Sequence, residues 1–167
     1  MKNRVVITGE GSISPLGLDS KSLWDNIING NSGVRKIESF NTENFSVKIA
    51  GEITDFNPED HFLTKEIKKL DRFTMLSLVA SDQAISSSGF NKKDVGVIVG
   101  TGVGGMHTLE EEQKKFLSRG QRGVSPFYVP KMIPNIAGGQ IAIKNGFFGA
   151  NFSMSTACSS ATDAIGM

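Results

Sequence analysis

The single cysteine, Cys158, is the residue in this sequence best suited to nucleophilic chemistry. Residues 151–155 precede it and are expected to form a short buried strand, and small polar residues lead from it into an expected helix. A residue at such a turn lies near unpaired backbone N–H groups and the positive end of the helix dipole, which favour a negative charge. A thiol in such a position ionises more readily and is a better nucleophile. Cys158 is therefore a candidate catalytic residue.

A structural role for Cys158 is the alternative, because cysteine is often buried as a small core residue. Two features favour the catalytic interpretation. The residue falls at a junction between elements rather than inside an apolar run, and its neighbours are small, which leaves room for a ligand. These neighbours are Ser155, Thr156, Ala157, Ser159 and Ser160.

A second motif, Gly100-Thr-Gly-Val-Gly-Gly105, matches the G-x-G-x-x-G pattern of dinucleotide-binding turns. That function requires a second strand ending in an acidic residue about 20 positions further on. Residues 120–126 contain neither a strand pattern nor an acid. We therefore expect a tight backbone turn, close to a ligand at most, rather than a nucleotide site.

The two histidines, His61 and His107, do not complete a site for Cys158. His61 falls in a polar connecting segment and His107 at the start of a charged helix. Exposed, structural roles are expected for both. A cysteine–histidine acyl-transfer site is thus incomplete on the sequence evidence alone.

Apolar patterning predicts the elements that would position these residues. Buried strands are expected at residues 4–8, 95–100 and 151–155, and an edge strand or hairpin at 47–53. Helices are expected at residues 20–29 and 64–87, after Gly105, after Pro134 and after Cys158. The proline-bounded segment 126–130 is expected to be extended, and residues 31–46 irregular. Alternating strands and helices indicate an α/β layered sheet.

Composition excludes several kinds of partner and site. The chain has 167 residues, a net charge of +1 and one cysteine, so neither nucleic acid nor a membrane surface is an expected partner. One cysteine excludes an internal disulfide framework and a multi-cysteine metal site, and no metal ligands are assigned. The apolar run near the N-terminus is too short for a signal peptide and no run reaches membrane-spanning length. A cytoplasmic protein is expected.

Several segments, in order along all 167 residues, resemble the β-ketoacyl-acyl-carrier-protein synthases, with a pattern similar to the type II enzymes of bacterial fatty-acid synthesis. The segments are Arg4-Val-Val-Ile-Thr-Gly9, Ser14-Pro-Leu-Gly17, Trp24, Gly30-Asn-Ser-Gly33, Asp71-Arg-Phe73, Gly100-Thr-Gly-Val-Gly-Gly105, Ser125-Pro-Phe-Tyr-Val-Pro130 and Ser155-Thr-Ala-Cys-Ser-Ser160.

The resemblance implies a thiolase-like layered fold and a decarboxylating Claisen condensation. An acyl chain passes from the phosphopantetheine of an acyl carrier protein to the cysteine thiolate. A malonyl-carrier thioester then loses CO₂, and its carbanion attacks the acyl-enzyme. No separate cofactor is implied, because the phosphopantetheine is carried by the substrate protein.

The resemblance also assigns residues. Cys158 matches the family's nucleophile, and its own backbone N–H would be one oxyanion donor. The residue matching Val103 lines the acyl pocket, where Ala157 is also placed. Residues matching Tyr128 and Val129 reach the partner's pocket across a homodimer interface.

Departures from the family pattern shape the expectation for this chain. Family members are more than twice as long, and their two catalytic histidines, a lysine and a second oxyanion loop follow the cysteine. Neither His61 nor His107 matches those histidines. Asp163 stands where many members carry a histidine outside the catalytic pair, and no role is assigned to it.

Residues 1–167 are therefore expected to be an N-terminal β-ketoacyl synthase domain, the N-terminal half only, truncated just after the nucleophile and inactive in condensation alone. Three alternatives stay open: a polyketide ketosynthase, a CoA-dependent thiolase-fold enzyme, and a non-catalytic fragment.

Overall fold

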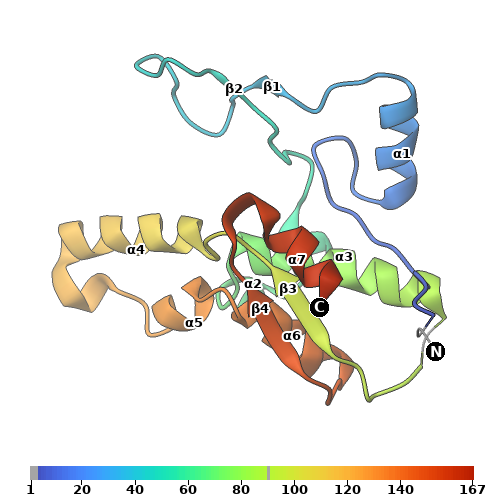
Figure 1. Cartoon of the computed structure of the whole chain (residues 1–167). Coiled ribbons are helices and arrows are strands. Elements are labelled where there is room, and N and C mark those ends of the chain that lie inside the picture. Colours follow the sequence, from blue (N-terminus) through green and yellow to red (C-terminus); the bar gives the residue numbers. More distant parts are fainter. Residues whose placement is uncertain (1–3, 90) are drawn as a thin grey trace. The chain divides into compact units, whose positions relative to one another are not determined.

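The structure, a computed structural model, describes residues 4–89 and 91–167. Figure 1 shows its helices and strands, coloured along the sequence. The chain divides into two compact units. The first unit comprises residues 1–57 and 79–90, and the second comprises residues 58–78 and 91–167. Each unit is described by itself below, and the second contains Cys158.

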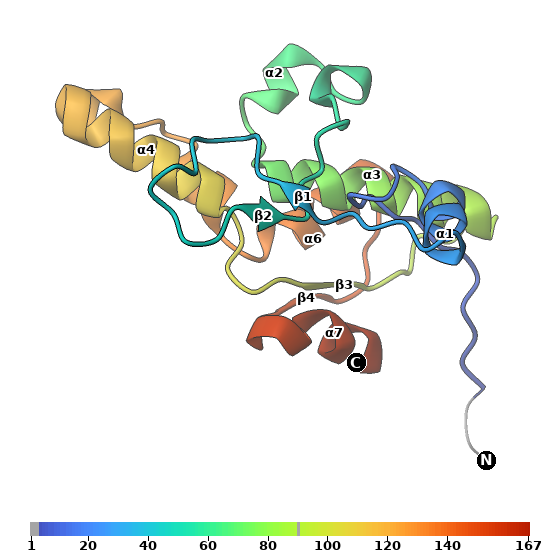
Figure 2. The same ribbon diagram turned by 90° about the horizontal axis from the view of Figure 1, so that it is seen from above.

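The second unit is built around a two-stranded parallel ladder. Strand β3 pairs with β4 in a register that places Val97 opposite Asn151. Helix α6 covers one face of this ladder and α7 the other (Figure 2). Their bounds are β3 Val97–Gly100, β4 Asn151–Met154, α6 Ile136–Asn145 and α7 Ser160–Gly166. Helices on both faces of parallel strands are the α/β layering that the sequence predicted.

Close backbone contact brings α7 onto β3. A Cβ atom added to Gly100, the last residue of β3, would lie 2.3 Å from the Ser160 carbonyl oxygen at the start of α7. Only a residue without a side chain permits this approach. On the opposite face, Ala137 and Ile141 of α6 are buried. The Cys158 turn is therefore held between a tightly packed strand and helix.

The expected helix over residues 64–87 is wrong in one respect, because it is divided into α2 (Thr64–Ile67) and α3 (Arg72–Ser88). A short turn at 58–60, η1 (Pro58–Asp60), precedes them. Asp71 begins α3, since its Oδ1 atom accepts a hydrogen bond from the Phe73 N–H at 3.0 Å. Apolar spacing continues through the break and so does not reveal this N-cap.

The proline-bounded segment is also not extended as expected. After α4 (Met106–Arg119) and η2 (Gly120–Gly123), it enters the short helix α5 (Tyr128–Met132). The Tyr128 N–H donates to the Ser125 carbonyl at 3.0 Å and starts the turn. Pro130 lies in the first turn of α5, where the missing N–H of proline has no intrahelical partner to lose.

In the first unit, helix α1 (Ser20–Ile28) confirms the predicted helix, and Asp19 is its N-cap. Asp19 Oδ1 accepts from the Ser22 N–H at 2.7 Å, and Ser22 Oγ accepts from the Asp19 N–H at 3.3 Å. The predicted hairpin is a two-residue antiparallel ladder of β1 (Arg35–Lys36) and β2 (Ile49–Ala50), so residues 31–46 are not wholly irregular.

The strand predicted at residues 4–8 is not formed. Val5 and Ile7 are 90% and 92% exposed, and the ladder described in this unit, β1 with β2, does not include them. A strand requires a neighbouring strand for its backbone hydrogen bonds. The following residues instead lie along α3, where Ser87 Oγ accepts from the Glu10 N–H at 3.0 Å.

Candidate active site

Cys158 lies in a one-turn 3₁₀ helix, η3 (Ala157–Ser159), between β4 and α7. It is a free and exposed cysteine. The alternative that it fills a core position is therefore wrong. The thiol belongs to a tight turn that joins the carboxyl end of a strand to a helix, as the sequence predicted. The strand itself is not buried as expected, because Asn151 and Phe152 are exposed and Ser153 and Met154 are half-buried.

The backbone immediately before Cys158 is strained. Among the described residues other than glycine, Ala157 alone has a positive φ, at 52°. A side chain in this left-handed region costs free energy and persists only where the surroundings enforce it. Residues with this geometry cluster at active sites. Small neighbours were noted in the sequence, but nothing in it predicted the left-handed conformation of Ala157.

Buried Ser160 holds one side of this turn. Its Oγ atom accepts from the Thr156 N–H at 2.9 Å and donates to the Ala157 carbonyl at 2.7 Å. The residue is 3% exposed. One hydroxyl thus bonds the Thr156 N–H and the Ala157 carbonyl, on either side of the strained φ. These bonds fix the path of the chain from β4 to Cys158.

The glycine loop, residues 101–105, lies beside the Cys158 turn. The Thr101 N–H donates to the Met154 carbonyl at 3.0 Å, and Ser155 Oγ donates to the Gly102 carbonyl at 3.1 Å. These bonds bring the loop that carries Val103 next to the turn. The Val103 side chain is 59% exposed and so is available to a bound chain.

Helix α5 joins the same loop from the other side. The Gly105 N–H donates to the Met132 carbonyl at 2.9 Å. At Gly104, whose φ is +81°, an added Cβ would lie 2.6 Å from that carbonyl oxygen. This contact comes from the last residue of α5, whereas Tyr128 and Val129 form its first turn. The loop is therefore bonded to the Cys158 turn through Gly102 and to the end of α5 through Gly105.

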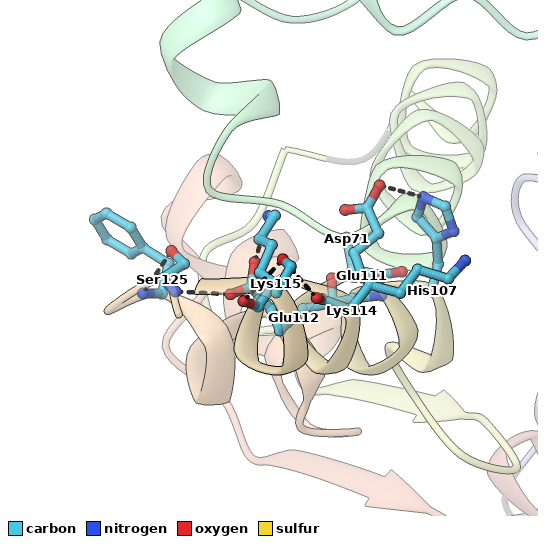
Figure 3. A network of polar contacts seen from close by, with 10 residues as sticks. Asp71, His107, Glu111, Glu112, Lys114, Lys115 and Ser125 are labelled. Atoms are coloured by element: carbon cyan, nitrogen blue, oxygen red, sulfur yellow. Dashed lines mark hydrogen bonds and ion pairs between the residues drawn. The ribbon is translucent and has the colours of Figure 1, made fainter. Parts of the chain in front are cut away.

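A buried polar network positions α4, the helix that follows the loop (Figure 3). Asp71 Oδ2 accepts from both the backbone N–H and the hydroxyl of Thr108, at 2.9 and 2.5 Å. Asp71 is 3% and Thr108 1% exposed. The sequence placed Asp71 inside a long helix, and so its role as an anchor for α4 was not predicted.

The same network includes Glu112, although the charge run of α4 was expected to be a solvated face. Glu112 is 3% exposed, accepts from Lys115 Nζ at 2.7 Å and from the Ser125 N–H at 2.6 Å. Burial acts to raise the pKa of Glu112, but the hydrogen bonds from Lys115 and Ser125 outweigh it and hold the pKa below its ordinary value. Glu112 thus ties α4 to the segment entering α5.

The histidines lie elsewhere in the second unit. His107 Nε2 lies 3.3 Å from Glu111 Oε1 on the exposed face of α4. His61 lines an open groove of about 340 Å³ together with Phe62, Glu66, Lys69, Leu70, Leu78, Gln140, Ile143 and Lys144. Cys158 and the predicted acyl-pocket residues do not line that groove, so it is separate from the Cys158 turn.

Across the described ranges, 4–89 and 91–167, no helix is both long and apolar enough to cross a membrane.

Comparison with known proteins supports the resemblance to the β-ketoacyl synthases. Residues 2–167 match the family model of the β-ketoacyl synthase N-terminal domain. A 3-oxoacyl-[acyl-carrier-protein] synthase 2 from Staphylococcus aureus is 44% identical over 168 residues, 98% of this chain. One from Vibrio cholerae is 38% identical over 170 residues, 99% of this chain. The chain spans 41% of the length of each.

Solved structures show the same fold. A ketosynthase in a type II polyketide acyl-carrier-protein complex superposes with a TM-score of 0.80 at 26% identity, covering 99% of this chain and 45% of its own. A β-ketoacyl synthase from Burkholderia phymatum gives 0.80 at 22% identity, covering 99% and 42%. The thiolase-like α/β fold predicted from the sequence is confirmed. The chain belongs to the β-ketoacyl synthase family and matches its N-terminal domain.

Proposed function

We propose that Cys158 is the acyl-accepting nucleophile of a decarboxylating condensation that elongates fatty-acyl chains on an acyl carrier protein. The observation that carries this proposal is the exposed thiol at a strained strand–helix turn. Membership of the β-ketoacyl synthase family and curated relatives at 38–44% identity, each named 3-oxoacyl-[acyl-carrier-protein] synthase 2, support it.

The first step is thioester exchange. The Cys158 thiolate attacks the acyl carbonyl of an acyl-carrier thioester, the tetrahedral oxyanion collapses, and the carrier's phosphopantetheine leaves as a thiol. Backbone N–H groups at the turn, that of Cys158 included, are proposed to hold the oxyanion. No separate cofactor takes part in this step, since the phosphopantetheine arrives on the carrier protein.

The second step forms the carbon–carbon bond. A malonyl-carrier thioester releases CO₂, and the electron pair left on its α-carbon attacks the acyl-Cys158 carbonyl. The Cys158 thiolate leaves, and the product is a β-ketoacyl thioester that is two carbons longer. His61 and His107 lie apart from the Cys158 turn and are not proposed as the groups that assist decarboxylation. We therefore assign the acyl-transfer half of the reaction to the residues of this chain.

The acyl chain is proposed to lie against Ala157 and Val103. The hydrogen bond between Ser155 and the Gly102 carbonyl supports this placement, because it joins the two segments that carry these residues. Tyr128 and Val129 are proposed to act across a homodimer interface, in a partner subunit's pocket. Val129 is 54% exposed, which leaves its side chain available for that contact.

Mass spectrometry tests the proposed first step directly. The 167-residue chain is incubated with an acyl-carrier thioester, and its tryptic peptides are examined for the acyl mass. We expect the acyl group on the Cys158 peptide and none in the Cys158→Ala variant. A wild-type chain that reacts with iodoacetamide at Cys158 but never accepts an acyl group would contradict the proposal.

Polyketide synthesis is the second candidate pathway, because the ketosynthase with a TM-score of 0.80 is part of a type II polyketide system. The higher identity of the curated synthase 2 relatives favours fatty-acid elongation. Competition between a fatty-acid carrier protein and a polyketide carrier protein for acyl transfer to Cys158 separates the two. Faster transfer from the fatty-acid carrier is expected, and the reverse preference would assign the polyketide pathway.

A further inference from the structure

We propose that Asp163 is a positioning residue for Cys158, whose carboxylate holds the turn together across the nucleophile. The inference rests on the proposed role of Cys158 as the acyl acceptor. It concerns a residue to which neither the sequence patterns nor the family resemblance assigned a function.

The bonds of Asp163 span the nucleophile. Its Oδ2 atom accepts a hydrogen bond from the hydroxyl of Thr156, two residues before Cys158. The same oxygen lies 3.3 Å from Ser159 Oγ, one residue after Cys158. Asp163 is in the first turn of α7, and helical side chains point back toward the helix N-terminus, so a carboxylate at this position reaches the preceding turn.

The hydroxyl distances show which bond matters most. Ser159 Oγ has one proton and lies 2.8 Å from the Thr156 carbonyl, 3.0 Å from Thr156 Oγ1 and 3.3 Å from Asp163 Oδ2. The shortest of these contacts takes the proton. The hydroxyl of Thr156 then donates to Asp163. The Thr156–Asp163 hydrogen bond is therefore the principal contact of this carboxylate.

The Thr156–Asp163 hydrogen bond complements the hydrogen bonds made by Ser160. Ser160 bonds the backbone of Thr156 and Ala157 from inside the unit, whereas Asp163 bonds the Thr156 side chain and is half-buried. Both act on the segment whose Ala157 φ of 52° would otherwise relax. Without Asp163, Thr156 keeps its backbone bond but loses its side-chain anchor. The residues flanking Cys158 are then free to move relative to α7.

The benefit we assign to Asp163 is geometric. A second negative charge near a thiolate disfavours that thiolate. Asp163→Asn keeps an oxygen that accepts the Thr156 hydrogen bond but removes the charge, so it should still position Cys158. Asp163→Ala removes the acceptor, so it should no longer position Cys158. The pair Thr156→Ser and Thr156→Val makes the same comparison from the donor side, since serine keeps the hydroxyl and valine keeps only the shape.

The test measures two rates at Cys158 for each variant of the 167-residue chain: alkylation by iodoacetamide and acyl transfer from an acyl-carrier thioester. We expect Asp163→Ala and Thr156→Val each to lower both rates on the order of tenfold, with the fall in acyl transfer in kcat rather than KM. Thr156→Ser and Asp163→Asn should stay within about twofold of wild type. The double variant Thr156→Val/Asp163→Ala should be no slower than either single variant, because the two substitutions remove the same hydrogen bond. Asp94→Ala, a substitution at an exposed aspartate of the same unit, is the matched control.

Wild-type rates in both Asp163→Ala and Thr156→Val would overturn the inference, as would additive losses in the double variant. If Asp163→Ala does not fold, the Thr156→Val and Thr156→Ser pair decides alone. Failure of the wild-type chain to accept an acyl group, with alkylation rates that still separate the variants, would remove the proposed function and leave the role of Asp163 in place.

Discussion

The two units differ in how their segments are held. Around Cys158, side chains only a few residues apart complete the bonds of the turn: Ser160 satisfies the Thr156 and Ala157 backbone, and Asp163 bonds the Thr156 hydroxyl. In the first unit, α1 has no buried residue, and Val5 and Ile7 lie exposed in a segment predicted to be a strand. Local hydrogen bonds can fix a turn, but an apolar strand or helix face needs packing from elsewhere in the fold.

The largest loss of stability should come from substituting Gly100, because backbone atoms of α7 occupy the space that a side chain there would need. In Gly100→Ala, the new Cβ would lie 2.3 Å from the Ser160 carbonyl oxygen and 2.6 Å from the Ala161 nitrogen. Both are backbone atoms, so β3 and α7 must move apart. We expect a loss of about 3 kcal/mol in the free energy of unfolding, measured with urea.

Gly139→Ala is the matched control for Gly100, because an added Cβ there meets nothing within 4 Å and the residue lies in α6. That variant should gain about 0.5 kcal/mol. Equal effects of the two substitutions would show that α7 is not packed tightly on β3.

Removing the Asp71 carboxylate should have the next largest effect. Asp71→Ala leaves the buried Thr108 N–H and hydroxyl without their acceptor and removes the cap on Phe73. A loss of about 2 kcal/mol is expected in urea unfolding. Thr108→Val removes the hydroxyl alone and should cost about 1 kcal/mol. If Asp71→Ala were as stable as wild type, the anchoring of α4 described above would be incorrect.

Glu112 gives a pH-dependent contribution to the same region. Its pKa is held below the ordinary value of 4.5 in the folded chain, so the unfolded chain binds the proton first as the pH falls. The stabilisation is therefore present above about pH 4.5 and is lost as the pH falls through the folded-state pKa. Unfolding free energies measured from pH 7 to pH 3 should fall less steeply in Glu112→Gln than in wild type. Parallel curves would contradict this assignment.

The smallest effect is expected in the first unit, at Trp24. Its side chain is 62% exposed on a helix without buried residues. Trp24→Ala should change the unfolding free energy by less than about 0.5 kcal/mol. A loss of about 3 kcal/mol or more, as for a buried tryptophan, would show that the α1 face is covered in solution and would remove the contrast between the units.

The sequence predicted the elements whose signals are local. Apolar patterning gave β3, β4 and α1, and the junction after residue 155 gave the position of Cys158. Two of the errors involve contacts that are distant in sequence, whereas the turn that starts α5 is local, between Ser125 and Tyr128. Residues 4–8 needed a strand partner, and the Asp71 carboxylate that caps α3 is also bonded by Thr108, 37 positions later.

The candidate site was predicted less completely than the fold. The glycine loop was correctly expected to be a tight turn. Its hydrogen bond to Ser155 joins residues 53 positions apart in the sequence, and so it could not be inferred from spacing. The left-handed Ala157 carries no sequence signal, because alanine rarely adopts this conformation. Asp163 did carry a sequence signal, since a negative charge in the first turn of a helix is favoured by the helix dipole.

The most direct test of the central claim counts the thiols released when acyl-carrier thioester is mixed with the chain in the absence of malonyl thioester. The account predicts a burst of one carrier-protein thiol per chain, with the acyl group recovered on Cys158 and no burst in Cys158→Ala. No burst from a chain whose Cys158 reacts with iodoacetamide, or a burst that survives Cys158→Ala, would contradict it.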